Sequence, residues 1–289
     1  MKKFLLRYLP VDLKESIRIG YGSLRGNHPI LIYSMGKVGS RSVYNFLKSV
    51  HMPNPIYHVH LLSHDWIKEF NTYFSSLRPP ISPRHMKMSK IIRKELDKKT
   101  SVKWKVITLV REPIHVRISG FFQNVNEFHP DLIDNVGNLK IEQAIKFLRK
   151  TLINFDKSRN PIDVYFRMWF EKDFKDSLHI DVLAHNFNHE NGFTIIREKT
   201  FDILVIRFED LNECFDTAIM NFLHLNRTAT LERANITGEK QHGEAYKYIL
   251  ENVDIPGYVC EKIYSLKYAK HFYTEEMINK FINKWSRNT

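Results

Sequence analysis

Short apolar runs alternate with amphipathic segments along most of this chain, and this alternation constrains the fold more than any other feature. The runs at 29–34, 106–110 and 203–208 are almost without charge, which is typical of strands buried on both faces of a sheet. Another strand is predicted at 56–62, and a tight turn is expected to join 193–196 to 203–208. Strands that alternate with helices predict an α/β fold with a mainly parallel central sheet flanked by helices.

Helical periodicity fills most of the sequence between these strands. We expect helices within 43–50, 61–99, 140–155, 161–177, 210–225 and 240–287, the second of them interrupted by Pro79, Pro80 and Pro83. Residues 1–28 are basic and mixed in character, and they are expected to form a peripheral helix and linker. Residues 29–289 are expected to form a single α/β domain, which is an ordinary size for one core.

The chain carries an excess of positive charge, with 44 Lys and Arg against 32 Asp and Glu and a formal net charge of +12. Such an excess favours anionic partners, for example phosphorylated cofactors, acidic glycans, anionic lipid or nucleic acid. The basic residues are scattered, and neither an RNA-binding aromatic signature nor a zinc-finger spacing occurs. Nucleic acid is therefore not the expected partner.

Cysteine content and hydropathy indicate the cellular compartment in which the protein is expected. Cys214 and Cys260 are too few for a disulfide scaffold and lie outside any zinc-binding spacing. No apolar run approaches the ~18 residues that would cross a bilayer. Charged residues from Arg7 onward break the short apolar run at the start, so no cleaved signal peptide is expected. These features predict a cytoplasmic protein.

A glycine-containing loop follows the first predicted strand, at the edge of the sheet where parallel α/β folds bind ligands. This lysine loop, residues 34–42, reads Ser-Met-Gly-Lys-Val-Gly-Ser-Arg-Ser and leads into a helix. Glycines let backbone N–H groups turn inward, the helix start adds partial positive charge, and Lys37 adds a full charge. Ser40 and Ser42 could cap the helix and bond phosphate oxygens. An ordinary turn with a solvated lysine is the alternative, and the loop is not a Walker A motif, because Lys37 precedes Gly39.

A second informative stretch, the Arg-Glu-Pro segment at residues 110–122, follows the strand predicted at 106–110. Arg111 ends the strand, and Ser119 lies about two turns into a helix that begins at Pro113. A guanidinium and a hydroxyl so placed can share one phosphate. Pairing of Arg111 with Glu112 or Asp210 is the alternative.

Together and in this order, the two segments resemble those of the PAPS-dependent sulfotransferases. The resemblance implies a P-loop-like three-layer sulfotransferase fold, with PAPS as co-substrate, 3′,5′-ADP as product and no metal ion. It also implies that the lysine loop holds the 5′-phosphosulfate and that the Arg-Glu-Pro segment holds the 3′-phosphate. The implied nucleotide-binding residues are Lys37, Val38, Gly39, Ser40, Arg41, Ser42, Arg111, Ser119 and, in a late loop at 236–240, Lys240.

Within this family, a bacterial capsular polysaccharide synthesis subgroup is named for an Asn-Lys-Trp-Tyr-Ser signature. The stretch from Trp169 through Val182 and the terminal Asn283-Lys284-Trp285-Ser286 resemble that subgroup, although the signature here lacks its Tyr. The segment at 207–211, Arg-Phe-Glu-Asp-Leu, is also similar to a segment that many sulfotransferases carry after a later strand.

The candidate catalytic base is a histidine in Tyr57-His58-Val59-His60-Leu61. Alternation along a strand places His58 and His60 on one face, about 7 Å apart. Histidine is suited to proton transfer because its ordinary pKa lies close to working pH. A similar segment in some polysaccharide sulfotransferases uses its second histidine as the base, which implies that role for His60 and an auxiliary contact with the acceptor for His58.

Other interpretations of these residues remain open. The two histidines could bind zinc, although a third ligand is not evident, or they could be ordinary strand residues. Glu112, Glu209 and Asp210 are fallback bases, while Glu209 and Asp210 are more typical of a cap on the following helix. Trp104 and Trp169 are expected to pack in the core rather than stack on adenine.

The sequence thus predicts an enzyme that transfers a sulfuryl group from PAPS to a carbohydrate hydroxyl. The acceptor is expected to be a polysaccharide or other glycan, anionic or lipid-linked, held by walls at 62–100 and 124–160. A peripheral membrane contact through residues 1–20 is compatible with their apolar pattern. The alternatives are a P-loop nucleotide kinase and a non-catalytic basic protein that binds glycan or nucleic acid on the same scaffold.

Overall fold

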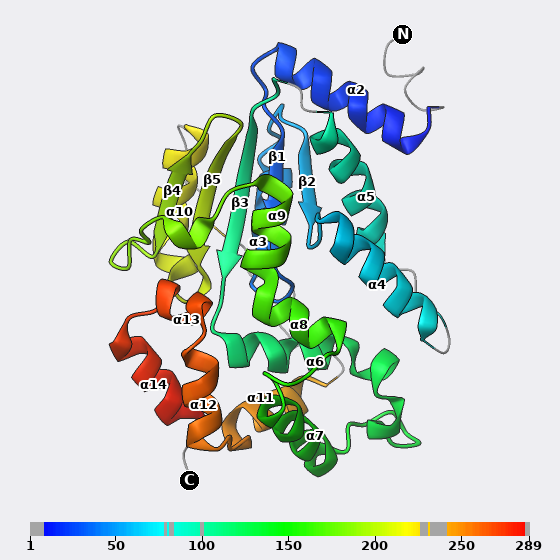
Figure 1. Cartoon of the computed structure of the whole chain (residues 1–289), viewed down its shortest axis with the longest axis vertical. Helices are drawn as coiled ribbons and strands as arrows, with labels where there is room; N and C mark the ends of the chain where they lie inside the picture. The colour runs from blue at the N-terminus through cyan, green and yellow to red at the C-terminus, as the bar shows by residue number, and fades with distance from the viewer. Residues whose placement is uncertain are drawn as a thin grey trace.

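The fold is built on one five-stranded sheet with the order β2-β1-β3-β5-β4 (Figure 1). The computed structural model describes residues 9–77, 80, 84–98, 101–225, 231 and 242–286. The strands are β1 (Ile30–Tyr33), β2 (Ile56–Val59), β3 (Trp104–Val110), β4 (Phe193–Arg197) and β5 (Phe201–Arg207). The first three and β5 run parallel, whereas β4 pairs antiparallel with β5. The predicted α/β fold with a mainly parallel sheet is confirmed.

The antiparallel edge follows from the short connection between β4 and β5. Only three residues separate these strands, and a connection that short can join neighbouring strands only when they run in opposite directions. The remaining strands are joined through helices, as parallel neighbours require.

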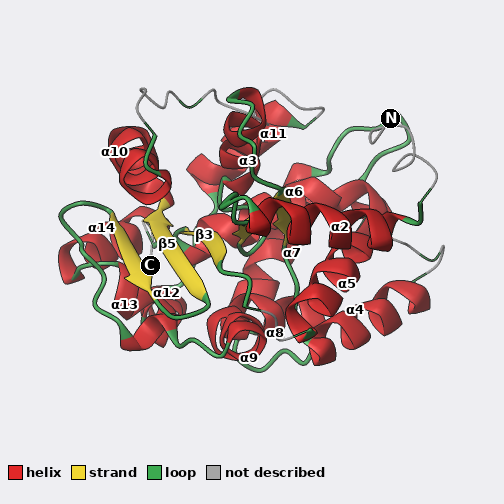
Figure 2. Cartoon of the chain, turned by 90° about the horizontal axis from the view of Figure 1, so that it is seen from above, coloured by secondary structure: helices red, strands yellow, loops and turns green. Residues whose placement is uncertain are grey.

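Helices cover both faces of the sheet, with α3 and α10 on one side and α8 and α9 on the other (Figure 2). The longer helices are α2 (Val11–Leu24), α3 (Ser40–Ser49), α4 (His64–Ser76), α5 (Arg84–Asp97), α6 (Pro113–Phe128), α7 (Ile141–Ile153), α8 (Pro161–Met168), α10 (Leu211–Leu223), α11 (Gly243–Asn252), α12 (Gly257–Tyr264) and α14 (Glu275–Trp285). Shorter helical pieces are η2 (Pro130–Leu132), η3 (Trp169–Phe174), α9 (Lys175–Leu178), η4 (Val182–Ala184), η5 (Phe208–Asp210) and α13 (Lys267–Phe272). None of the described helices is both long and apolar enough to pass through a membrane.

The central strands are buried on both faces, which explains their uninterrupted apolar sequence. Every residue of β1 and β5 is buried, as are six of the seven residues of β3. Trp104 and Trp169 are 3% and 1% exposed, so both pack in the core as predicted.

Two predicted elements differ in detail. The strand β2 ends at Val59, so His60 lies one residue beyond it rather than within it. The helix predicted at 161–177 is interrupted by η3, a π-helical segment of six residues. A π-helix adds a residue to the turn and rotates the side chains that follow. Here Trp169 and Asp173 both turn towards the carboxyl ends of β1 and β2, where they form hydrogen bonds.

Candidate active site

The lysine loop and the Arg-Glu-Pro segment lie side by side at the carboxyl edge of the sheet. The strands β1 and β3 are neighbours, so the two connections leave the sheet next to each other. One guanidinium nitrogen of Arg111 (Nη1) donates to the backbone carbonyl of Lys37 at 3.0 Å and to Ser119 Oγ at 3.4 Å. The same guanidinium lies 4.2 Å from the centre of the Phe208 ring. Arg111 therefore links both segments to the end of β5.

Two carboxylates accept hydrogen bonds from backbone N–H groups of the Arg-Glu-Pro segment. Glu112 accepts the backbone N–H groups of Ile114 at 2.7 Å and His115 at 2.9 Å, which caps α6, and it also accepts the Tyr264 hydroxyl. Burial raises the pKa of Glu112 to about 7. Glu209 accepts the backbone N–H of Glu112 at 2.9 Å. These carboxyl groups hold the backbone around Arg111.

Asp210 stands at the N-cap position of α10, but the prediction that its side chain or that of Glu209 caps this helix is wrong. No side chain caps the start of α10. Asp210 instead pairs with Arg207, whose guanidinium also donates to the carbonyls of His189 and Phe272. A buried arginine that ends β5 attracts the nearest carboxylate more strongly than neutral backbone N–H groups do.

The lysine loop turns through two residues in the left-handed region, Lys37 at φ 70° and Gly39 at φ 84°. Gly39 is the residue that precedes α3, and no side chain caps this helix. The prediction that Ser40 or Ser42 caps it is therefore wrong, because both serines lie inside the first turn. Ser40 is 4% exposed and bonds His58, Val38 is fully buried, and Arg41 is exposed on the outer side of α3.

Gly39→Ala is expected to lower the free energy of unfolding by about 2–4 kcal/mol. A Cβ at this position would lie 2.6 Å from the Phe208 ring, and the left-handed backbone adds strain for any residue with a side chain. Chemical denaturation of Gly39→Ala and of the wild-type chain measures the difference in the free energy of unfolding. Gly36→Ala is the matched control, since a Cβ there meets no atom within 4 Å. Equal losses for both variants would contradict the packing described here.

The charged and polar groups of the site have partners on α6 and α11 that the sequence did not indicate. Lys37 Nζ donates to Gln123 on α6. Ser119 Oγ lies 3.1 Å from the Tyr246 hydroxyl on α11. Lys240, the remaining predicted nucleotide contact, lies outside the described residues, as do Pro79, Pro83 and residues 1–8.

His60 is held so that one ring nitrogen can accept a proton. Its Nδ1 lies 2.8 Å from the carbonyl of Ser34, and a carbonyl only accepts, so Nδ1 carries the hydrogen and Nε2 has the lone pair. The backbone carbonyl of His60 accepts Trp169 Nε1 at 3.0 Å and the Tyr165 hydroxyl at 3.2 Å. Desolvation lowers the pKa of His60 to about 4. At neutral pH the imidazole is uncharged and suited to act as a base.

His58 lies beside His60 but points to the lysine loop. The ring centres are 4.8 Å apart, and His58 Nε2 lies 2.9 Å from Ser40 Oγ. Desolvation lowers the pKa of His58 to about 2, so it too is neutral. The geometry connects His58 to the loop serine, while its contact with an acceptor stays a prediction. Among the described residues, no group of three or more His, Cys, Asp or Glu side chains is arranged to hold a metal ion.

The depressed pKa of His60 predicts a stability difference in acid. An unfolded histidine binds a proton below about pH 6.5, whereas folded His60 resists protonation until about pH 4, so acidification favours unfolding. When the pH falls from 7 to 5, the free energy of unfolding should decrease in both proteins. The decrease should be about 1–2 kcal/mol smaller for His60→Asn than for the wild-type chain. Denaturation midpoints at the two pH values test this. An identical pH dependence for both proteins would show that His60 titrates normally in the fold.

Asp173 is a buried carboxylate that no sequence motif marks. It accepts the Tyr33 hydroxyl at 2.6 Å and the backbone N–H of Ser63 at 2.8 Å, and it is fully buried. Burial raises its pKa to about 6. Asp173 thereby ties the end of β1 to the turn that carries His60 into α4. Its helical spacing from Trp169 and Phe170, four and three residues earlier, is the one signal that could have revealed it.

The C-terminal signature lies behind the Arg-Glu-Pro segment. Trp285 is fully buried, its carbonyl accepts the backbone N–H of Ile255 at 2.8 Å, and its ring packs 5.8 Å from that of His115. Trp285 therefore packs against the first turn of α6. Trp285, in the stretch expected to resemble the signature, is thus a packing residue, and it lies outside the residues that match the family model.

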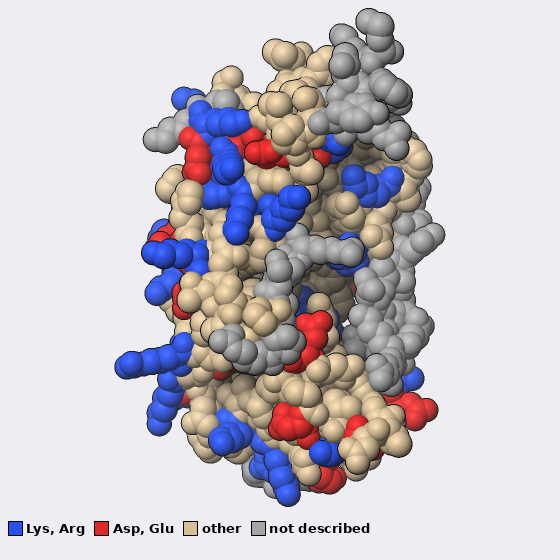
Figure 3. All heavy atoms as spheres, turned by 90° about the vertical axis from the view of Figure 1, so that its right-hand side faces the viewer, with Lys and Arg blue, Asp and Glu red and all other residues tan. Residues whose placement is uncertain are grey.

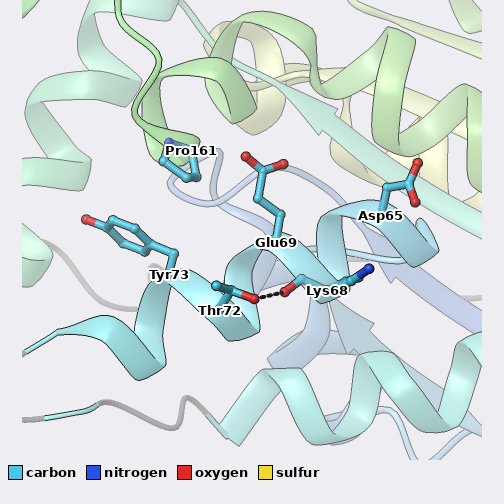
Figure 4. Close-up of a pocket in the computed structure, with 6 residues that line it drawn as sticks. All are labelled: Asp65, Lys68, Glu69, Thr72, Tyr73 and Pro161. Atoms are coloured by element: carbon cyan, nitrogen blue, oxygen red, sulfur yellow. Dashed lines mark hydrogen bonds between the residues drawn. The ribbon is translucent and has the colours of Figure 1, made fainter.

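A shallow hollow of about 400 Å³ lies between α4 and the start of α8 (Figure 4). The carboxylates of Asp65 and Glu69 point to the same side of α4 in this view. The lining residues are Asp65, Lys68, Glu69, Thr72, Tyr73 and Pro161. The hollow falls mainly on the stretch at 62–100 that was expected to form an acceptor wall, and its lining includes neither Lys37 nor Arg111.

Comparison with known proteins shows a similarity to one family over residues 138–274. No curated protein and no solved structure gives a significant match. A family model matches the chain from the approach to α7 to just past the end of α13. The match includes Trp169 and Asp173 but neither the lysine loop nor Arg111. Residues 138–274, just under half of the chain, are similar to the NKWYS family, described as “Putative capsular polysaccharide synthesis protein”.

Proposed function

We propose that this protein is a sulfotransferase that moves a sulfuryl group from PAPS to a hydroxyl of a carbohydrate acceptor. The observation that carries the proposal is the hydrogen bond from Arg111 to the backbone of Lys37. It joins an anion-binding turn to an arginine and serine pair at one edge of the sheet. A nucleotide with phosphates at both its 5′ and 3′ positions is a ligand that two such anion sites, side by side, would bind.

The histidine next to this site supplies the base. The acceptor hydroxyl gives its proton to Nε2 of His60 and attacks sulfur in line. The bond from sulfur to the bridging phosphate oxygen breaks, and its electrons leave with the 5′-phosphate of 3′,5′-ADP. Lys37 and the N–H groups at the start of α3 stabilise the charge that gathers on that oxygen. A bound polyanion also raises the pKa of His60, which makes it a stronger base when the donor is present.

A carbohydrate acceptor is supported by the likeness to the capsular polysaccharide family over 138–274. The hollow beside α4 offers two carboxylates, a threonine hydroxyl and an aromatic ring. Carboxylates accept hydrogen bonds from sugar hydroxyls, and aromatic rings pack against their C–H faces. The family likeness favours a glycan over a small phenolic or steroid alcohol.

Titration calorimetry with 3′,5′-ADP in the absence of magnesium tests the nucleotide site. We expect micromolar binding, weakened about 10-fold to 100-fold by Arg111→Ala, because a charge-assisted hydrogen bond to phosphate is lost. Arg197→Ala at the end of β4 is the matched control and should bind normally. Magnesium-dependent binding of ATP would instead support a nucleotide kinase. Binding of neither nucleotide would leave a non-catalytic glycan-binding protein.

A further inference from the structure

The helix α2 packs one face against the fold and leaves an apolar face exposed. Its inner face is buried through Glu15, Ile19 and Gly22, and Glu15 accepts the Tyr57 hydroxyl of β2 at 2.8 Å. The outer face carries Leu13, Ile17, Tyr21 and Leu24 at spacings of four, four and three residues, so they form one stripe along the helix.

This outer stripe is strongly exposed. Leu13, Ile17 and Tyr21 are 47%, 41% and 48% exposed, and Leu24 is 88% exposed. With Val11, the helix holds five of the nine large apolar side chains that are exposed among the described residues. Scattered exposed apolar residues are ordinary, but a continuous stripe on one 14-residue helix indicates a surface that is covered by something else.

Basic residues border the stripe. Lys14, Arg18 and Arg25 follow it along one side of α2. Arg18 also pairs with Glu15 at 2.9 Å, and the Arg25 guanidinium lies 4.4 Å from the centre of the Tyr21 ring. On the other side, Lys98 at the end of α5 donates to Ser16. Basic side chains gather on the upper part of the face that carries α4 and α5, near α2 (Figure 3). Exposed lysines continue along α5 at Lys87, Lys90 and Lys94.

The position of α2 keeps this surface apart from the candidate active site. The helix lies at the amino ends of β1 and β2, since the carbonyl of Gly22 accepts the backbone N–H of Asn27 and its Cα faces Pro55. In Figure 1 it lies at the end of the molecule opposite α6 and α7. A partner that covers the stripe would leave the lysine loop accessible.

We propose that the outer face of α2 docks on the surface of an anionic lipid bilayer. An amphipathic helix whose apolar stripe is bordered by Lys and Arg lies in the membrane interface, with its apolar side chains among the acyl chains. A second copy of the chain fits less well. A two-fold contact through the stripe would bring Lys14, Arg18 and Arg25 against the same residues of a chain that also carries a net charge of +12.

Co-sedimentation of the full chain with vesicles tests the proposal. We expect binding to vesicles of phosphatidylglycerol mixed with phosphatidylcholine and little binding to phosphatidylcholine alone. Ile17→Asp and, separately, Leu24→Asp should each weaken the binding at least about tenfold. Leu24 is so exposed that its replacement leaves the core intact, which guards against a folding defect. Tyr258→Asp on α12, where the tyrosine is 64% exposed, is the matched control and should bind like the wild-type chain.

Three results would overturn the proposal. The first is the absence of binding to the anionic vesicles at low salt. The second is binding that Ile17→Asp and Leu24→Asp leave unchanged, which would place the contact elsewhere on the basic surface. The third is a dimer in light scattering that Ile17→Asp dissociates, because a second copy would then cover the stripe. None of these results bears on nucleotide binding, so the sulfotransferase proposal stands or falls separately.

Discussion

His60→Asn is expected to turn over about 10²-fold to 10⁴-fold more slowly than the wild-type chain, the range found when a general base is removed. The side-chain N–H of asparagine can still donate to the Ser34 carbonyl that His60 Nδ1 now meets at 2.8 Å. The local backbone should therefore persist while the lone pair of Nε2 is lost. Release of 3′,5′-ADP from PAPS in the presence of a capsular polysaccharide preparation measures the rate.

The control for this variant is His185→Asn. His185 directly follows η4, outside both expected acceptor walls, and its side chain is 37% exposed. We expect normal turnover from it, and unchanged affinity for 3′,5′-ADP from both variants. If His60→Asn keeps full turnover, the base is another group, and Glu209 or Asp210 would be examined next.

Lys37→Ala should lower turnover by about 10²-fold to 10³-fold, as expected when one preorganised donor to a developing negative charge is removed. The substitution leaves the backbone preference almost unchanged, because lysine and alanine both carry a Cβ at the left-handed φ of 70°. It removes the ammonium group that donates to Gln123. The loss should fall mainly on kcat, since the charge it stabilises appears only in the transition state.

Lys48→Ala is the matched control, because Lys48 is an exposed lysine in the last turn of α3. It should leave kcat and KM unchanged. Full activity of Lys37→Ala with PAPS would show that the lysine loop does not hold the transferred group. A rise in KM alone would mean that Lys37 contributes equally to the ground state and the transition state.

The positions of the strands along the chain and the meeting of the two segments could be predicted from sequence because both depend on local patterns. Uncharged apolar runs mark central strands, and parallel strands bring their carboxyl ends to one edge of the sheet. The expectation that Arg111 and Lys37 lie together followed from that geometry, and the two residues are hydrogen-bonded. Their roles in binding a nucleotide stay predictions.

The predictions that were wrong concern side chains whose hydrogen-bond partners could not be read from the neighbouring sequence. Ser40 was expected to cap its own helix, but it bonds His58, and Asp210 bonds Arg207 rather than the start of α10. Tyr33 and Asp173 are 140 residues apart. A serine or aspartate near a helix start has several partners of similar strength, and only the packed fold decides among them.

The support of His60 from the segment Tyr165–Asp173 has a consequence for chimeric proteins. Tyr165 and Trp169 bond the His60 carbonyl, and Asp173 fixes the turn that follows it. All three lie inside the stretch similar to the capsular family, whereas Lys37 and Arg111 lie outside it. The same stretch also carries Phe208, Glu209 and Tyr246, which contact Arg111, Glu112 and Ser119. Grafting it from a second such protein would thus replace the supports of both His60 and the Arg-Glu-Pro segment, so a poorly matched graft should displace the imidazole and the Arg111 guanidinium together.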